Sequence, residues 1–232
     1  MNIDPKDPKK ADRDRFVLSK GHTAPGLYSA LAERGYFPKE DLVTLRHLGS
    51  YLQGHPDMKH IPGVDMSSGS LGQGISAAVG MAISAKLSND DYRVYTLLGD
   101  GEIQEGQVWE ASMLAGFRKL DNLVVIVDNN NLQIDGRIDE VNSPYPIDKK
   151  FEAFNFHVIN IDGHDFDQIA AAFKEAKETK GMPTAIIAKT IKGKGVSFME
   201  DQAGWHGKAP NDEEYKIAME DLEKAGEALC QK

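Results

Sequence analysis

Acidic and amide side chains occur at two separate points of the chain where they could bind a divalent metal ion. Asp100 lies within Gly99-Asp100-Gly101, and residues 128–131 have the sequence DNNN. Carboxylate and amide oxygens are hard donors, which suit Mg²⁺ or Ca²⁺ better than a metal that prefers thiolates. Mg²⁺ commonly binds through one or two protein oxygens together with the phosphates of a ligand. The two segments therefore predict a magnesium site that also holds a diphosphate.

The elements around these residues predict how they come together. Residues 92–98 are rich in aromatic and β-branched side chains, and residues 123–127 are continuously apolar, which is typical of a strand buried on both faces. The apolar spacing between them predicts a helix that begins after Gly101 and directs free N–H groups toward a phosphate. A strand–helix–strand unit of this length predicts a right-handed parallel crossover, so Asp100 and Asn130 should meet at one sheet edge. Taken alone, the Gly-Asp-Gly tripeptide is equally consistent with a plain strand-to-helix turn.

The remaining patterns predict an α/β protein with a mostly parallel sheet and helices on both faces. Further strands are expected at 16–18, 156–161 and 183–188, and further helices at 24–34, 39–48, 75–87, 148–155, 166–180 and 211–228. Asp165 is expected to cap the helix at 166–180, and residues 137–146 are expected to form a loop. We divide the chain into an extended lead-in at 1–15, a ligand-binding domain at 16–210 and a C-terminal helix at 211–232.

Composition excludes several classes of function. The formal net charge of −9 argues against nucleic acid or an acidic membrane surface as a partner. The only cysteine is Cys230, so no disulfide framework is possible, which fits the reducing cytoplasm. The chain contains no apolar run near the ~18 residues of a transmembrane helix, and its polar first residues do not resemble a signal peptide. With 41% hydrophobic residues, it can bury an ordinary globular core.

Several sequence segments resemble the transketolase family of thiamine-diphosphate enzymes. Within the central unit these are GDGEIQEG, WEA, LAG, LDNLVVIVDNN and QIDG; before it come DRDRFVLSKGH, GHP and PGVDMSSGSLGQG. The resemblance extends from about Asp12 to Pro210. It implies a thiamine-diphosphate-binding fold and a transferase of the pentose phosphate pathway. Such an enzyme moves a two-carbon ketol unit between sugar phosphates, using thiamine diphosphate with Mg²⁺ or Ca²⁺.

The resemblance also implies roles for individual residues. Asp100, Asn130 and the backbone carbonyl of Leu132 would bind the metal. The residues that would contact the cofactor are Gly69, Leu71, Gly99, Gly101, Glu105, Ile134 and His206. His22, His55 and His206 would be catalytic, whereas spacing alone makes each of them an ordinary loop histidine. Glu105 and Glu110 would lie in an acidic cluster at a subunit interface, although acidic residues also favour exposed helix starts. Lys20 is expected to make a surface or loop contact, and His164 to serve a turn.

The resemblance further implies that this chain needs a partner. It covers the diphosphate-binding domain only, while the glutamate that activates the cofactor belongs to a pyrimidine-binding domain. We therefore expect a split transketolase, active as a heterotetramer with a C-terminal subunit that carries that domain. Self-association is also expected, because the Ala- and Gly-rich helix at 75–87 and the Trp109 surface should not face water. An earlier helical region that precedes DRDRF in transketolases is missing. The alternatives are a subunit of deoxyxylulose-phosphate synthase or of a 2-oxoacid dehydrogenase, or a non-catalytic binding subunit.

Overall fold

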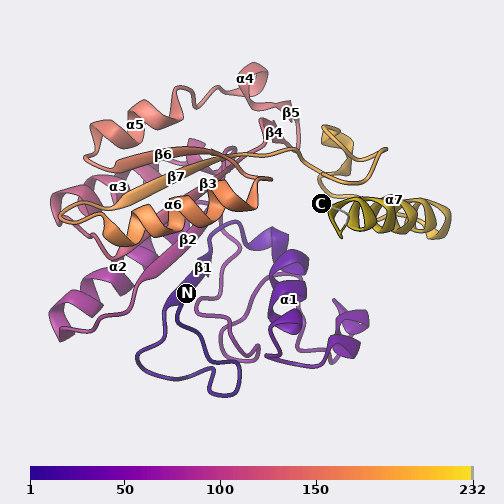
Figure 1. Cartoon of the computed structure of the whole chain (residues 1–232), viewed down its shortest axis with the longest axis horizontal. Helices are drawn as coiled ribbons and strands as arrows, with labels where there is room; N and C mark the ends of the chain where they lie inside the picture. Colours follow the sequence, from indigo (N-terminus) through magenta and orange to yellow (C-terminus); the bar gives the residue numbers. More distant parts are fainter. Residues whose placement is uncertain (231–232) are drawn as a thin grey trace.

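The computed structural model describes residues 1–230 and contains a parallel sheet with helices on both faces (Figure 1). The strands of this sheet are β1 (Arg15–Leu18), β2 (Val94–Gly99), β3 (Leu123–Asn129), β6 (His157–Asp162) and β7 (Thr184–Lys189). The α-helices are α1 (Ala24–Glu33), α2 (Gln73–Ser88), α3 (Gly106–Phe117), α4 (Ile138–Val141), α5 (Ile147–Ala153), α6 (Phe166–Glu178) and α7 (Asp212–Cys230). The predicted α/β class is confirmed. Of the predicted C-terminal segment 211–232, residues 231–232 lie outside the described residues.

The sheet has the strand order β1-β2-β3-β7-β6, and every neighbouring pair is parallel. A small antiparallel pair, β4 (Leu132–Gln133) with β5 (Gly136–Arg137), follows β3. In the β2–β3 register, Gly99 lies opposite Asp128, so the residues after both strands emerge side by side at one edge. The predicted strand–helix–strand unit is therefore present, with its polar residues at the expected edge.

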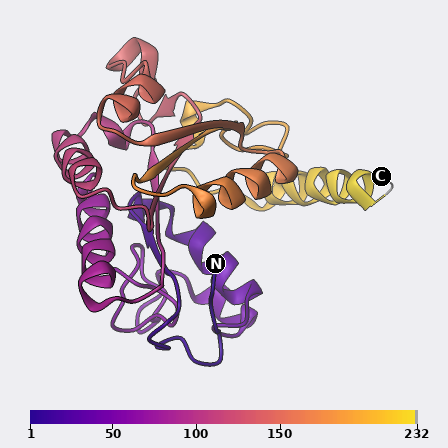
Figure 2. The same cartoon turned by 60° about the vertical axis from the view of Figure 1, so that its left-hand side comes forward.

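The apolar cores on the two faces of the sheet differ in size. Helices α2, α3 and α5 bury the larger apolar core against one face, and Figure 2 shows α2 and α3 lying next to each other. Helix α6 covers the other face through a smaller cluster that includes Ala172 and Ala176. A third cluster, around Tyr28 and Leu52, supports α1 and the loops after it. Because side chains alternate along a strand, Val94 and Leu98 reach the first core while Tyr95 reaches the second.

Three local predictions are wrong. Residues 39–48 form only a short 3-10 helix, η2 (Lys39–Thr44), because Val43 and Leu48 are exposed and Arg46 has a positive φ of 62°. The predicted loop 137–146 contains the short helix α4. The helix after Gly101 begins only at Gly106, following the 3-10 helix η3 (Glu102–Gln104). The predicted cap by Asp165 is confirmed, since its side chain accepts hydrogen bonds from the first turn of α6.

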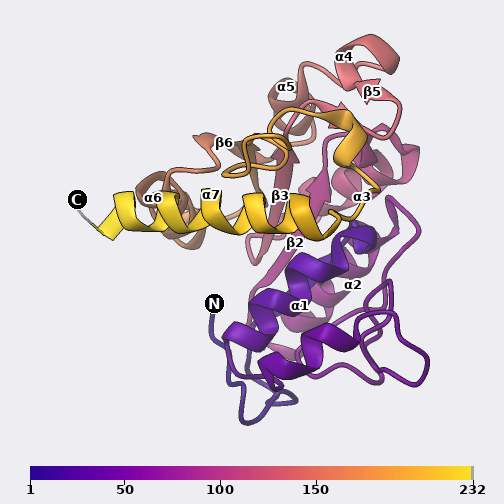
Figure 3. The same ribbon diagram turned by 90° about the vertical axis from the view of Figure 1, so that its right-hand side faces the viewer.

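The last helix, α7, extends beyond the rest of the molecule (Figures 1 and 3). It is fastened to the loop after β7 by Asp221, which accepts hydrogen bonds from the backbone N–H and the hydroxyl of Ser197 at 2.9 and 2.7 Å. Among the described residues, no helix combines the length and apolar character needed to cross a membrane.

Candidate cofactor site

A cavity of about 700 Å³ opens at the edge where the parallel strands end. Most of the predicted site residues line it: His22, Leu71, Gly99, Asp100, Gly101, Glu105, Asn130, Leu132, Ile134 and His206. His55, Gly69 and Glu110 are not among its lining residues. The cavity lies where ligands of open α/β sheets bind, so the topology and the chemistry point to the same place.

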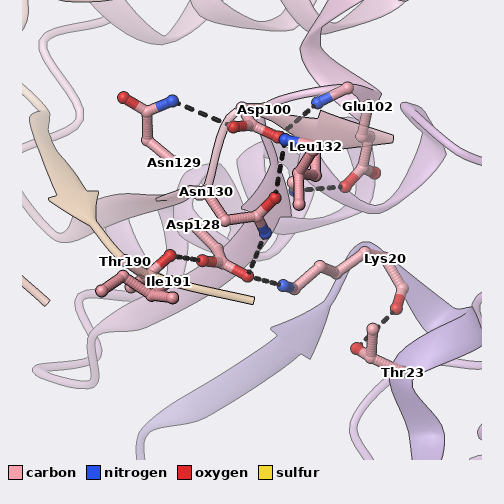
Figure 4. Close-up of polar contacts among 12 residues, drawn as sticks. Lys20, Thr23, Asp100, Glu102, Asp128, Asn129, Asn130, Leu132, Thr190 and Ile191 are labelled. Carbon is pink, nitrogen blue, oxygen red and sulfur yellow. Dashed lines mark hydrogen bonds and ion pairs between the residues drawn. The ribbon is translucent and has the colours of Figure 1, made fainter. Parts of the chain in front are cut away.

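Asp100 is a buried acid of this cavity, with only 1% of its surface exposed. Its carboxylate accepts hydrogen bonds from the backbone N–H of Gly101 at 2.9 Å and of Asn131 at 2.6 Å, and from the Asn129 amide at 2.9 Å (Figure 4). Burial raises the pKa of Asp100, and the charge of Asp128 adds to this, while these hydrogen bonds oppose it. A cation placed here would offset the cost of burying the charge.

The asparagine side chain that contacts Asp100 is that of Asn129, not that of Asn130. The Asn130 amide oxygen accepts from the Leu132 backbone N–H at 2.9 Å, and its nitrogen points toward Asp128 at 3.4 Å. An amide oxygen carries two lone pairs, so Asn130 keeps one for another partner. Asn130 and Leu132 both line the cavity beside Asp100, and their role as metal ligands stays a prediction.

A buried ion pair lies beneath these residues. Lys20 donates a hydrogen bond to Asp128, which also accepts one from the Thr190 hydroxyl (Figure 4). Only 11% of the Lys20 side chain is exposed, so the prediction of a surface or loop contact for Lys20 is wrong. Burial alone would raise the pKa of Asp128, but the charge and hydrogen bond of Lys20, with Thr190, bring it below its ordinary value. The pair fixes β1, β3 and β7 together at the cavity floor.

Two of the predicted histidines stack on each other. The rings of His22 and His206 are 5.3 Å apart, although the residues are far apart in sequence. Burial and the surrounding positive charges lower the pKa of His22 to about 4, and burial with Lys192 and Lys20 lowers that of His206. Both rings are therefore neutral near pH 7. Within the described chain, Nδ1 of His206 is buried and has no hydrogen-bond partner.

The third histidine lies beside the cavity rather than in its wall. His55 is exposed, and a Cβ added to Gly69 would come within 3.1 Å of its ring. The small residue at position 69 therefore allows the His55 ring to pack closely over its backbone. The charge of His55 contributes to the lowered pKa of His22, so the two histidines are near each other.

The predicted interface glutamates are both exposed. Glu105 precedes the first turn of α3 and lines the cavity, whereas Glu110 lies further along the helix. The Trp109 ring is half-buried and packs against Phe151 and Phe154 of the same chain at 5.2 and 6.0 Å, so part of its apolar surface is covered internally, and a subunit surface at Trp109 stays a prediction.

Two residues near the cavity have roles that their sequence positions did not indicate. Glu102 lies where the sequence predicts the start of a helix, but it is buried, with 3% of its surface exposed. His164, expected to serve a turn, does so through its backbone N–H, and its Nε2 also accepts from Ile191 at 2.8 Å. Local sequence could not indicate the burial of Glu102 or the contact of His164 with Ile191, because both depend on segments that are distant in sequence.

The residues fit a magnesium–diphosphate ligand. Asp100, Asn130 and Leu132 carry oxygen atoms and line the same cavity, and Lys20 and Lys192, which also line it, would supply positive charge. Gly101 leaves room at the cavity wall, because a Cβ there would lie 3.2 Å from Gln133. No group of three or more His, Cys, Asp or Glu residues suited to a metal occurs within 1–230.

Comparison with known proteins identifies the family. Residues 1–225 match the family described as transketolase, thiamine diphosphate binding domain. The chain is 49% identical to the 6-deoxy-6-sulfo-D-fructose transketolase subunit SqwG of Clostridium sp. (strain MSTE9), over 97% of this chain and 82% of that protein. It is 43% identical to an apulose-4-phosphate transketolase subunit of Actinobacillus succinogenes, over 96% and 80%. The crystal structure of transketolase from Campylobacter jejuni superposes with a TM-score of 0.91 at 39% identity, over 96% of this chain and 36% of that one.

These matches confirm the predictions of the family, of its fold and of a transferase subunit. The alternative families expected from the sequence are not needed to explain any segment of the chain. The cavity, with its buried acid and stacked histidines, therefore belongs to a thiamine-diphosphate-binding domain, and the chain is a member of the transketolase family that corresponds to a transketolase subunit.

Proposed function

We propose that this chain is the cofactor-binding subunit of a two-chain transketolase that moves a two-carbon ketol unit from a ketose phosphate to an aldose phosphate. The observation that carries this proposal is the pattern of coverage. The chain matches four fifths of relatives named as subunits, but only 36% of the single-chain transketolase. The pyrimidine-binding domain would then come from a second polypeptide, and the assembly would act in the cytoplasm on sugars of the pentose phosphate type.

The residues of the cavity have distinct tasks in this proposal. Asp100, Asn130 and the carbonyl of Leu132 would hold Mg²⁺, with Ca²⁺ as a substitute, and the Gly101 amide would meet the diphosphate. Leu71 and Ile134 offer apolar contacts to the rings of thiamine. Thiamine diphosphate bound there would supply the nucleophilic carbon that ketol transfer requires. The positive charges of Lys20 and Lys192 favour the anionic parts of both ligands.

The histidines would handle protons of the substrate. A neutral imidazole can accept a proton from a hydroxyl, and burial keeps His22 and His206 neutral at neutral pH. His206 lines the cavity, and its ring would accept such a proton or hold the hydroxyl in position. His55 would contact the substrate from the side of Gly69.

The assembly would bury surfaces that this chain leaves exposed. Met113, Leu114 and Phe117 on α3 and Leu87 on α2 are exposed apolar side chains, with Glu110 on the same helix as the first three. These residues support an interface on the α2–α3 side and a role of Glu105 and Glu110 there. A heterotetramer of two copies of each chain follows if that interface joins two active sites.

The test combines this chain with a candidate pyrimidine-binding subunit, Mg²⁺ and thiamine diphosphate. Ketol transfer is measured with a panel of ketose and aldose phosphates, together with 6-deoxy-6-sulfo-D-fructose and apulose-4-phosphate, which appear in the names of its relatives. We expect transfer that disappears when either chain is omitted. Asp100→Asn should lower it at least ~100-fold, and the exposed Asp90→Asn should not change it. A folded complex that binds the cofactor but transfers no ketol unit would support the non-catalytic alternative instead.

A further inference from the structure

Glu102 is a buried carboxylate that touches three parts of the cofactor site at once. Its Oε1 accepts hydrogen bonds from the Ser19 hydroxyl at 2.5 Å and from the backbone N–H of Gly72 at 2.9 Å. Its Oε2 accepts from the backbone N–H of Gly99 at 3.0 Å. With 3% of its surface exposed, Glu102 lies within the protein rather than at a helix start facing water.

Each partner of Glu102 adjoins a residue of the candidate site. Ser19 precedes Lys20 and His22 in the segment after β1, and Gly72 follows Leu71 at the start of α2. Gly99 ends β2 directly before Asp100. One side chain therefore links three segments that are far apart in sequence and that line the same cavity.

The segments around Glu102 pack so closely at their glycines that side chains at these positions would not fit. A Cβ added to Gly74 would lie 2.6 Å from Ser19, and one added to Gly72 would lie 2.8 Å from Glu105. Gly72 also has a positive φ of 80°, which favours glycine. In this close packing the backbone N–H groups of Gly72 and Gly99 both use Glu102 as their hydrogen-bond acceptor.

We propose that Glu102 is a positioning residue, whose carboxylate fixes Asp100, Leu71 and His22 relative to one another for cofactor binding. This inference rests on the proposed function. A carboxylate is required because both oxygens accept hydrogen bonds from backbone N–H groups. In Glu102→Gln the amide nitrogen must face the N–H of either Gly72 or Gly99, so one buried donor loses its acceptor.

The experiment measures cofactor affinity on the complex with the partner subunit. Isothermal titration calorimetry with Mg²⁺ and thiamine diphosphate compares wild type, Glu102→Gln and Asp65→Asn, below the melting temperature of each. Asp65 is the matched control, because it is also a buried carboxylate that accepts a backbone N–H, that of Phe16, and it does not line the cofactor cavity. We expect Glu102→Gln to raise the Kd about tenfold or more, with excess cofactor restoring most of kcat. Asp65→Asn should leave the Kd within about twofold of the wild-type value, although its melting temperature should fall about as much as that of Glu102→Gln.

The outcomes separate this inference from the proposed function. A wild-type complex that binds no thiamine diphosphate would overturn both. Normal binding by wild type and equal binding by folded Glu102→Gln would overturn the positioning role alone, as would an equal loss in Asp65→Asn. If Glu102→Gln does not fold, Ser19→Ala decides, since it removes one hydrogen bond and keeps the two to the backbone. It should raise the Kd about threefold, and an unchanged Kd would refute the role.

Discussion

The ion pair between Lys20 and Asp128 allows a quantitative prediction. Removing one partner of a buried pair leaves an uncompensated charge and costs about 3–5 kcal/mol. Here 23% of the Asp128 side chain is exposed, and it keeps hydrogen bonds from Thr190 and Asn130. For Lys20→Met we therefore expect a loss of about 2–3 kcal/mol in the free energy of unfolding, measured by urea denaturation of the cofactor-free chain at pH 7. The additional change Asp128→Asn should recover more than half of this loss.

The same protein contains a matched control for this prediction. Lys86 and Asp121 also form a Lys–Asp pair, at 2.6 Å, but 41% of the Lys86 side chain is exposed. Because solvent screens such a pair, Lys86→Met should cost less than about 1 kcal/mol. A cost at Lys20 no greater than at Lys86, or a coupling energy with Asp128 below about 0.5 kcal/mol, would refute the reasoning.

The pH dependence of the free energy of unfolding is a second test of the Lys20–Asp128 pair. The folded state holds the pKa of Asp128 below its ordinary value, so the unfolded chain binds more protons as the solution is acidified. The stabilisation is therefore present above the unfolded pKa of about 4 and is lost as the pH falls through the folded value. Lys20→Met should lack this contribution, and the difference in stability between the two proteins should narrow below pH ~4.

Three further predictions concern the site and the core. Asp100→Asn should lower the calorimetric affinity for Mg²⁺ with thiamine diphosphate at least ~100-fold, while the melting temperature of the cofactor-free chain changes by less than ~4 °C. Because the pKa of His22 is lowered to about 4, the urea midpoint of wild type should fall as the pH drops from 6.5 to 4, and His22→Asn should flatten this decline. A Cβ at Gly116 would lie 1.8 Å from the Phe154 carbonyl oxygen, so Gly116→Ala should cost more than ~3 kcal/mol in urea denaturation. Gly80→Ala, with nothing within 4 Å, should instead stabilise by ~0.5–1 kcal/mol.

Local sequence patterns were sufficient to predict the framework of the site. The apolar runs before Asp100 and Asp128 predicted two neighbouring parallel strands, and their register places Gly99 opposite Asp128. A polar residue at the carboxyl end of such a strand lies at the edge of the sheet where ligands bind, and this follows from the parallel topology alone. The cavity therefore lies where the sequence placed it, although the helix after Gly101 begins later than its apolar spacing indicated.

The contacts that join distant segments could not be predicted in this way. Nothing in the local sequence distinguishes buried Glu102 from an exposed glutamate, because its partners come from residues 19, 72 and 99. The Lys20–Asp128 pair likewise depends on how β1 and β3 are placed by the strand between them. The contacts of Trp109 with Phe151 and Phe154 were likewise not indicated, because these partners follow in a later helix and turn. In each case the missing information is tertiary.

The arrangement of the parallel strands has a consequence for how this protein can change its substrate. Many of the residues that line the cavity follow strand ends, whereas the main core lies between the strands and helices α2, α3 and α5. Substitutions at the rim can therefore alter which sugar is accepted while the buried packing that stabilises the chain stays intact. New substrate specificity can thus arise by exchanging loop residues one at a time, with little loss of folding stability at each step.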